Sequence, residues 1–156
     1  MDRSAVFCRR FLATDRCSFN SSCRPEASRE EHERLLATEE EIVGSLGLPY
    51  RVVNVAAGDL GASATKKYDI EAWFPTQRRY REVTSTSNTT DFQARRLDVR
   101  YRGERGVEPV HTLNGTAVTA RHMLAVLEIF QEEDGAVAVP EVLHPFGAPA
   151  RIEPSA

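Results

Sequence analysis

Residues 81–88, REVTSTSN, combine a carboxylate with several hydroxyl groups. Their composition favours a β-strand, in which successive side chains point to opposite faces. Regular alternation would place Glu82, Thr84 and Thr86 on one face and Val83, Ser85 and Ser87 on the other. A face built from a carboxylate and hydroxyls is costly to bury without partners, so it is either exposed to water or lines a pocket. Such oxygens are the hard ligands that Mg²⁺ prefers.

A second polar cluster, HTLNGT at residues 111–116, leads into an apolar-patterned segment that carries Arg121. We predict a strand over residues 110–114 and a helix over residues 116–131, with Gly115 permitting a tight turn between them. Thr116 would then cap the helix, and helix N-termini favour anions. Arg121 would lie in the second turn, where its guanidinium either clamps a phosphate oxygen or is simply exposed to solvent.

A long helix over residues 28–46 is the clearest local prediction. Ser28 and Glu31 have the spacing of a capping box, while Gly47 and Pro49 form a stop signal. The apolar positions favour one buried face, and they are Leu35, Leu36, Ile42, Val43 and Leu46.

Several short strands complete the pattern. We predict strands over residues 50–55, 68–74, 80–87, 97–101 and 137–140, with a hairpin between the second and third and a short helix over residues 91–96 capped by Asp91. The two common phosphate-binding glycine loops, GxGxxG and GxxxxGK[ST], do not occur. The predicted fold class is α+β, an antiparallel sheet flanked by helices. We predict no structure for residues 1–22 and a loose tail after Phe146.

Length and charge limit the function. The chain has 156 residues, the size of one domain, and a formal net charge of −3, which argues against a strongly basic nucleic-acid binder. A local cluster of arginines is either a solvated face or a basic patch, and its members are Arg95, Arg96, Arg100, Arg102 and Arg105. The three cysteines form no CxxC pair, and no segment reaches the roughly 20 apolar residues of a membrane span. We expect a cytoplasmic protein without membrane contact.

The stretch from Leu48 to Phe146 has a more specific pattern. It contains LPYRVVNVAAGDLG, KKYDIEAWFPTQRRYREVTSTSNTTDFQARR, VHTLNGT and AVLEIFQEEDGAVAVPEVLHPF in this order. These motifs resemble the C-terminal part of the catalytic domain of bacterial seryl-tRNA synthetases, which are class II aminoacyl-tRNA synthetases. The resemblance covers about two-thirds of the chain. It implies an antiparallel sheet flanked by helices, in agreement with the local patterns.

The resemblance also implies roles for particular residues. The segment Glu82, Val83, Thr84 and Ser85 is similar to the family's ATP-binding stretch, in which Glu82 and Ser85 would hold Mg²⁺. Thr116 matches a residue that contacts serine, and Asn114 lies beside it. Arg121 matches the catalytic arginine of motif 3, which contacts the ATP phosphates, although its spacing from Thr116 is one residue shorter than in many members.

The implied reaction has two steps. The serine carboxylate attacks the α-phosphate of ATP, which gives seryl-adenylate and releases pyrophosphate. The terminal ribose hydroxyl of tRNA(Ser) then takes the seryl group. Positioning and charge neutralisation carry much of such catalysis, so ATP, Mg²⁺ and an arginine are the expected components. The family also forms homodimers.

Several family features are absent from this sequence. It has no coiled-coil arm, no motif 1 or motif 2, no TxE segment, and no carboxylate within residues 18–22, where a serine-binding glutamate is expected. We therefore predict a divergent segment at residues 1–22, a partial catalytic domain at residues 23–147, and a tail at residues 148–156. The chain would be a fragment of the ligase. The alternatives are an inactive synthetase-like paralogue that acts as a binding or regulatory module, and an enzyme that aminoacylates a carrier protein.

Overall fold

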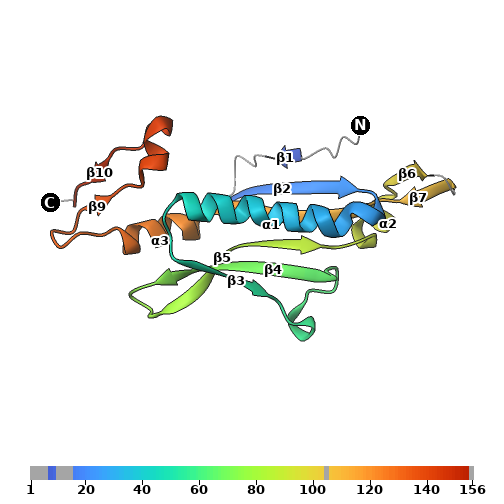
Figure 1. Cartoon of the computed structure of the whole chain (residues 1–156), viewed down its shortest axis with the longest axis horizontal. Coiled ribbons are helices and arrows are strands. Elements are labelled where there is room, and N and C mark those ends of the chain that lie inside the picture. The colour runs from blue at the N-terminus through green and yellow to red at the C-terminus, as the bar shows by residue number, and fades with distance from the viewer. Residues whose placement is uncertain (1–6, 10–15, 104–105, 155–156) are drawn as a thin grey trace.

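An antiparallel sheet with a long helix across one face forms the centre of the molecule (Figure 1). The structure is a computed structural model, and it describes residues 7–9, 16–103 and 106–154. The sheet is six-stranded, in the order β1-β2-β8-β5-β4-β3. Its strands are β1 (Phe7–Arg9), β2 (Arg16–Cys23), β3 (Tyr50–Asn54), β4 (Lys66–Phe74), β5 (Arg79–Asn88) and β8 (His111–Thr119). The predicted α+β class with an antiparallel sheet is confirmed.

Helices α1 (Ser28–Ser45) and α3 (Ala120–Ile129) pack on the same face of this sheet. Leu36 and Val43 of α1 and Val126 of α3 share a core cluster with Ile70 of β4 and Val83 of β5. The predicted apolar face of the first helix is confirmed, because Leu35, Leu36, Val43 and Leu46 are all buried. The opposite side of the sheet, here called the open face, carries partly exposed polar side chains.

Smaller elements lie at the two ends of the sheet. One end has the short helix α2 (Phe92–Leu97) and a hairpin of β6 (Arg100–Gly103) with β7 (Gly106–Pro109). The other end has β9 (Val137–Ala138) paired with β10 (Arg151–Ile152), as Figure 1 shows. Short 3₁₀ turns complete the order, and they are η1 (Pro25–Ala27), η2 (Ala57–Asp59) and η3 (Glu141–Phe146).

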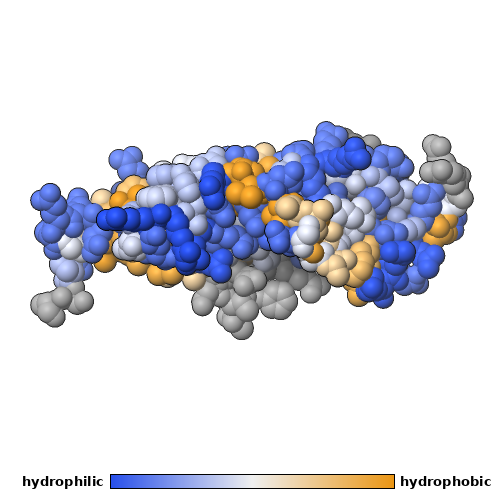
Figure 2. Space-filling view, turned by 90° about the horizontal axis from the view of Figure 1, so that it is seen from below, coloured by the Kyte–Doolittle hydropathy of each residue, from blue (hydrophilic) through white to orange (hydrophobic). Residues whose placement is uncertain are grey.

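The surface seen from the β3 side is mostly hydrophilic, with hydrophobic side chains gathered in small separate patches (Figure 2). Four of the five clustered arginines, Arg95, Arg96, Arg100 and Arg102, are exposed, while Arg105 lies outside the described residues. Arg95 pairs with Asp91, and Arg100 with Asp98, so these two arginines belong to a solvated, ion-paired surface. No helix in the described part of the chain is long and apolar enough to cross a membrane.

Strand β2 is the largest element that the sequence did not predict. It pairs with β8 along its whole length, from Arg16 opposite Thr119 to Cys23 opposite His111. The sheet therefore continues across the predicted boundary at residue 22. The predicted loose tail also contains the short strand β10, which pairs with β9. Arg151 of β10 forms ion pairs with Glu132, at 2.9 Å, and with Asp134.

The predicted capping box at the start of α1 is wrong. The chain enters α1 through the 3₁₀ turn η1, so that Ala27, rather than Ser28, is the N-cap residue. The Ser28 hydroxyl donates to the Pro25 carbonyl at 3.0 Å. The Glu31 carboxylate instead accepts hydrogen bonds from the Ser21 hydroxyl at 2.7 Å and from the Arg34 guanidinium at 2.6 Å.

The predicted helix start at Thr116 is also wrong. Strand β8 continues to Thr119, because its β-branched residues extend the pairing with β2. The Thr119 side chain accepts from the main-chain N–H of Arg121, and His122 completes a capping box. Gly115 makes no turn, since it lies within β8 and its φ is not positive. A Cβ there would lie 2.5 Å from Phe19 and 2.7 Å from Glu39, so glycine permits their close approach.

Two smaller predictions also need correction. Asp91 is the N-cap residue of α2 but makes no side-chain capping hydrogen bond. The strand predicted over residues 97–101 starts later, at Arg100, because α2 continues to Leu97 and Asp98 then adopts a left-handed conformation with φ 53°. The hairpin between β4 and β5 is confirmed.

Candidate active site on the open face

A β-bulge in β5 determines where the predicted metal ligands point. Opposite β4, Asp69 faces Ser85 and Ile70 faces Thr84, but Glu71 faces Glu82, so Val83 is an extra residue. Residues that face each other across antiparallel strands point to the same side of the sheet. Because Asp69 and Glu71 share the open face, Glu82 and Ser85 share it as well.

The regular alternation predicted for this strand is therefore wrong at Glu82, which lies on the open face with Ser85. Val83 and Thr84 are both buried on the side of α1, with 1% and 2% of their surface exposed. Any contact of these two residues with a ligand on the open face is confined to main-chain atoms.

Glu82 lies between two cationic side chains. The Arg121 guanidinium donates to the Glu82 carbonyl at 2.8 Å, and its Nη1 lies 3.8 Å from Oε2 of the carboxylate. Lys67 Nζ lies 3.8 Å from Oε1 and also pairs with Asp69 at 2.6 Å. Glu82 and Arg121 line a pocket of about 580 Å³ together with Glu71 and Tyr80. This side of the open face thus pairs a carboxylate with cations suited to phosphate.

The start of α3 is fixed to the bulge by side chains. Thr119 donates its hydroxyl to the Val83 carbonyl at 2.8 Å and accepts from the Arg121 N–H at 3.2 Å. His122 accepts from the Thr119 N–H at 3.1 Å, and burial lowers the pKa of its imidazole. Arg121 therefore lies in the first turn of α3 rather than the predicted second turn, with its guanidinium directed back to Glu82.

The predicted serine contacts lie on the neighbouring strand. Asn114 of β8 is opposite Ser87 of β5 and Asn20 of β2, and Thr116 is opposite Ser18. Asn114 and Thr116 are two residues apart, so they share a face, and it is the face opposite Glu39 and Phe19 at Gly115. The structure thus brings the predicted residues together, with Glu82, Ser85, Asn114 and Thr116 on the open face and Arg121 beside Glu82.

Sequence reasoning missed several open-face residues on β4 and β3. Lys67, Asp69 and Glu71 alternate along β4, and this period of two was a usable signal. Arg51 pairs with Glu71 at 2.6 Å and lies 4.6 Å from the centre of the Tyr80 ring. Charged side chains therefore extend the candidate site toward the β3 edge.

Glu39 of α1 is the other residue that was missed. It is 0% exposed, and its Oε1 accepts from the main-chain N–H of Thr116 at 3.2 Å. Burial raises the pKa of its carboxyl to about 8; the Thr116 N–H opposes this shift, and the charge of Asp69 adds to it. In the sequence, Glu39 belongs to a run of three glutamates that is typical of a solvated helix face.

The donor set is compatible with Mg²⁺. Within the described residues no group of three or more histidine, cysteine, aspartate or glutamate side chains could hold a metal ion. Glu82 and Ser85 provide two hard oxygen donors on one face, and Mg²⁺ commonly completes its six positions with water and substrate phosphates. The residues fit a metal held jointly with a phosphate ligand.

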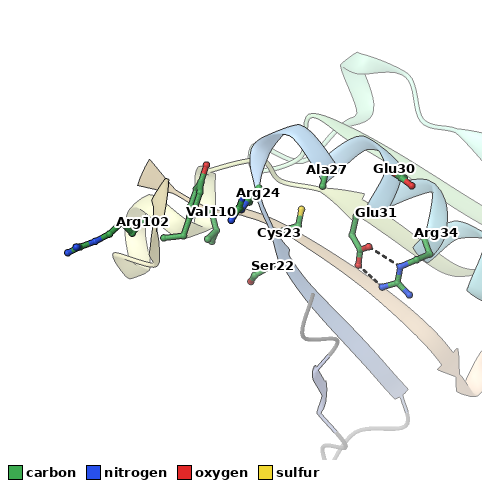
Figure 3. A pocket seen from close by; sticks show the side chains of 10 residues that line it. Ser22, Cys23, Arg24, Ala27, Glu30, Glu31, Arg34, Arg102 and Val110 are labelled. Atoms are coloured by element: carbon green, nitrogen blue, oxygen red, sulfur yellow. Dashed lines mark hydrogen bonds and ion pairs between the residues drawn. The ribbon is translucent and has the colours of Figure 1, made fainter. Parts of the chain in front are cut away.

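A separate pocket lies between β2, the start of α1 and the β6–β7 hairpin (Figure 3). Its lining includes Cys23, Arg24 and the ion pair of Glu31 with Arg34, while Arg102 points away from the cavity. None of the predicted site residues lines this pocket. It is therefore a feature distinct from the open-face site.

Comparison with known protein families identifies the fold class. A family model described as "tRNA synthetase class II core domain (G, H, P, S and T)" matches residues 8–130. The chain therefore belongs to the class II tRNA synthetase core-domain family.

Individual relatives are more specific. The chain is 61% identical to the serine–tRNA ligase of Leifsonia xyli subsp. xyli over 123 residues. This aligned region covers 78% of this chain and 29% of that protein. It is 58% identical to the serine–tRNA ligase of Clavibacter michiganensis subsp. michiganensis over 134 residues, which are 85% of this chain and 32% of that protein. The chain thus spans about a third of the length of these relatives, and the predicted resemblance to bacterial seryl-tRNA synthetases is confirmed.

Solved structures agree with this result. The seryl-tRNA synthetase from Pyrococcus horikoshii complexed with ATP superposes with a TM-score of 0.87 at 47% identity, over 90% of this chain and 32% of that one. The cytoplasmic serine-tRNA ligase from Naegleria fowleri in complex with AMP superposes with a TM-score of 0.82 at 38% identity, over 90% of this chain and 34% of that one.

Proposed function

We propose that the open face is part of a serine-tRNA ligase active site. The proposed activity is the ATP-dependent conversion of serine to seryl-adenylate, followed by transfer of the seryl group to tRNA(Ser). The observation that carries this proposal is the bulge at Val83, which places Glu82 and Ser85 on one face, beside Arg121. The similarity to serine–tRNA ligases supports the same function.

The proposed roles follow from the donor types. Arg121 provides a fixed set of N–H donors for phosphate oxygens, close to the N-terminus of α3. Glu82 and Ser85 would hold Mg²⁺, which neutralises phosphate charge when it is bound. Arg121 would bind the ATP phosphates and help to hold ATP in place while the serine carboxylate attacks the α-phosphate and pyrophosphate leaves.

Thr116 and Asn114 would bind serine at the centre of the open face. A hydroxyl and an amide are suited to hydrogen bonding with a substrate hydroxyl. A site of this kind rejects an analogue that lacks the hydroxyl, because its polar groups are then left unpaired. Alanine should accordingly bind more weakly than serine.

The partners proposed for the complete activity are serine, ATP, tRNA(Ser) and a second copy of the protein in a homodimer. The proposed location is the cytoplasm. These proposals rest on the family and on the relatives named above.

Serine-dependent exchange of pyrophosphate into ATP tests the activation step. We expect exchange that is lost in Glu82→Ala and Arg121→Ala and retained in Arg95→Ala, since Arg95 is exposed and pairs with Asp91. Calorimetric titration of Mg²⁺·ATP provides a second readout that needs no turnover. Absence of both exchange and Mg²⁺·ATP binding would contradict the proposal.

One observation favours the alternative of a binding module without ligase activity. On the open face β2 presents Ser18 and Asn20 at the position where the family resemblance implies a carboxylate for the serine ammonium group. Saturable binding of Mg²⁺·ATP without serine-dependent exchange would support this alternative.

A further inference from the structure

Glu39 lies directly behind the predicted serine contact. It projects from α1 to the sheet at Gly115, where a Cβ would approach its Oε1 to 2.7 Å. Its side chain is fully buried, and its Oε1 accepts from the Thr116 N–H at 3.2 Å. The second oxygen, Oε2, has no hydrogen-bond partner within the described residues.

Thr116 lies opposite Ser18 of β2 on one side, but on the β5 side its main chain is held by side chains rather than by strand pairing. Pairing between β5 and β8 covers Thr86 opposite Gly115 and continues only toward Leu113. At Thr116 the carbonyl accepts from the Thr84 hydroxyl, and the N–H donates to Glu39. The main-chain N–H and carbonyl of Thr116 therefore both bond to side chains at the point where the β5–β8 ladder stops.

We propose that Glu39 is a positioning residue for serine binding, which holds the Thr116 main chain so that the Thr116 hydroxyl is presented on the open face. This inference rests on the proposed role of Thr116 as a serine contact. Glu39 itself does not reach the open face, because it contacts the sheet from the α1 side. It acts through Thr116 rather than on the substrate.

The surroundings of Glu39 explain why a carboxyl group can serve here. Strands β8 and β2 present Thr116 and Phe19 to it, and neither residue titrates. Asp69 of β4 is the charged group whose field acts on it. With a pKa of about 8, the carboxyl is mostly protonated at neutral pH, and Oε1 remains an acceptor in both forms.

The main-chain amide of Thr116 gives a direct readout by ¹H–¹⁵N NMR of the whole chain. We expect the Thr116 amide proton to move downfield as the pH rises through about 8, because an ionised acceptor makes a stronger hydrogen bond. Glu39→Gln should abolish this titration and keep the acceptor. Glu41→Gln, an exposed position on the same helix, should leave it unchanged.

Serine and Mg²⁺·ATP titrations of the same samples test the consequence for binding. We expect Glu39→Leu to weaken serine binding roughly three- to tenfold, as for loss of one hydrogen bond, and to change Mg²⁺·ATP binding less than twofold. Glu39→Gln should restore serine affinity at pH 7. A purely structural role would weaken both ligands together.

Each negative result has a distinct meaning. A folded Glu39→Leu variant with unchanged serine affinity overturns the positioning role, whereas a Thr116 amide that does not respond to pH contradicts only the raised pKa of Glu39. If the wild-type chain binds no serine while its Thr116 amide does titrate with Glu39, the proposed function fails and so does the link from Glu39 to serine. If Glu39→Leu does not fold, serine affinity in the Glu39→Gln variant decides the question: affinity close to that of the wild type at pH 7 supports the positioning role, and loss of serine binding alone overturns it.

Discussion

The buried Glu39 carboxyl predicts an unusual dependence of stability on pH. Its pKa rises from 4.5 to about 8 on folding, so the folded protein holds this proton more tightly than the unfolded chain does. The free energy of unfolding should therefore fall as the pH rises from about 4.5 to 8 and then level off. The shift of 8 − 4.5 = 3.5 pK units, at about 1.4 kcal/mol per unit, sets an upper limit of about 5 kcal/mol.

Glu39→Gln removes the titration while preserving the shape of the side chain. We would measure urea unfolding by circular dichroism at several pH values between about 5.5 and 8.5. The wild type should lose stability relative to Glu39→Gln across this range, with a slope that does not exceed about 1.4 kcal/mol per pH unit. Taking the difference cancels the contributions of the histidines, which both chains share.

Glu41→Gln serves as the matched control, because Glu41 is exposed on the same helix. Its stability profile should run parallel to that of the wild type. If the difference between wild type and Glu39→Gln stays constant from pH 5.5 to 8.5, within about 0.5 kcal/mol, Glu39 is ionised in the folded protein. The argument from burial would then be wrong.

Three further predictions concern other parts of the structure. Gly115→Ala should destabilise the protein by about 1–3 kcal/mol in urea unfolding, because its Cβ would overlap Phe19, whereas Gly58→Ala should have little effect since nothing lies within 4 Å. Lys67→Met should tighten Mn²⁺ binding several-fold in an electron paramagnetic resonance titration, because a cation 3.8 Å from Glu82 is removed; unchanged affinity would argue against Glu82 as a ligand. Burial lowers the pKa of His32, so stability should fall as the pH drops below about 6.5, and His32→Phe should reduce this loss in acid unfolding curves.

The elements with strong local patterns were predictable. The 3.6-residue period around Leu35 and Val43 predicted α1, and alternation with turn residues predicted the β4–β5 hairpin. The residues of the candidate site were found by resemblance to a family. From local patterns alone, Glu82 and Arg121 were equally well explained as solvent-exposed side chains with no role in a binding site.

The remaining features depend on contacts between distant residues. Strand β2 has weak strand signals of its own and is defined by pairing with β8, about a hundred residues later in the chain. The start of α3 is set by the Thr119 hydroxyl and its contact with Val83, rather than by the helix propensity of its own residues. Glu39 looked solvated because its burial depends on the glycine at position 115, on another element.

The bulge at Val83 shifts the alternation of side chains along β5 by one residue. Glu82 and Ser85 therefore lie on the same face of the sheet although they are three positions apart, a spacing that would place them on opposite faces of a regular strand. Deleting the single residue Val83 would leave a regular ladder in which Thr84 stays opposite Ile70 and Glu82 stays opposite Glu71 on the open face, but it would remove the carbonyl that accepts from Thr119. The extra residue therefore leaves Glu82 on the face that a shorter, regular strand would also give it, and its own carbonyl is the one that holds the start of α3 beside Glu82.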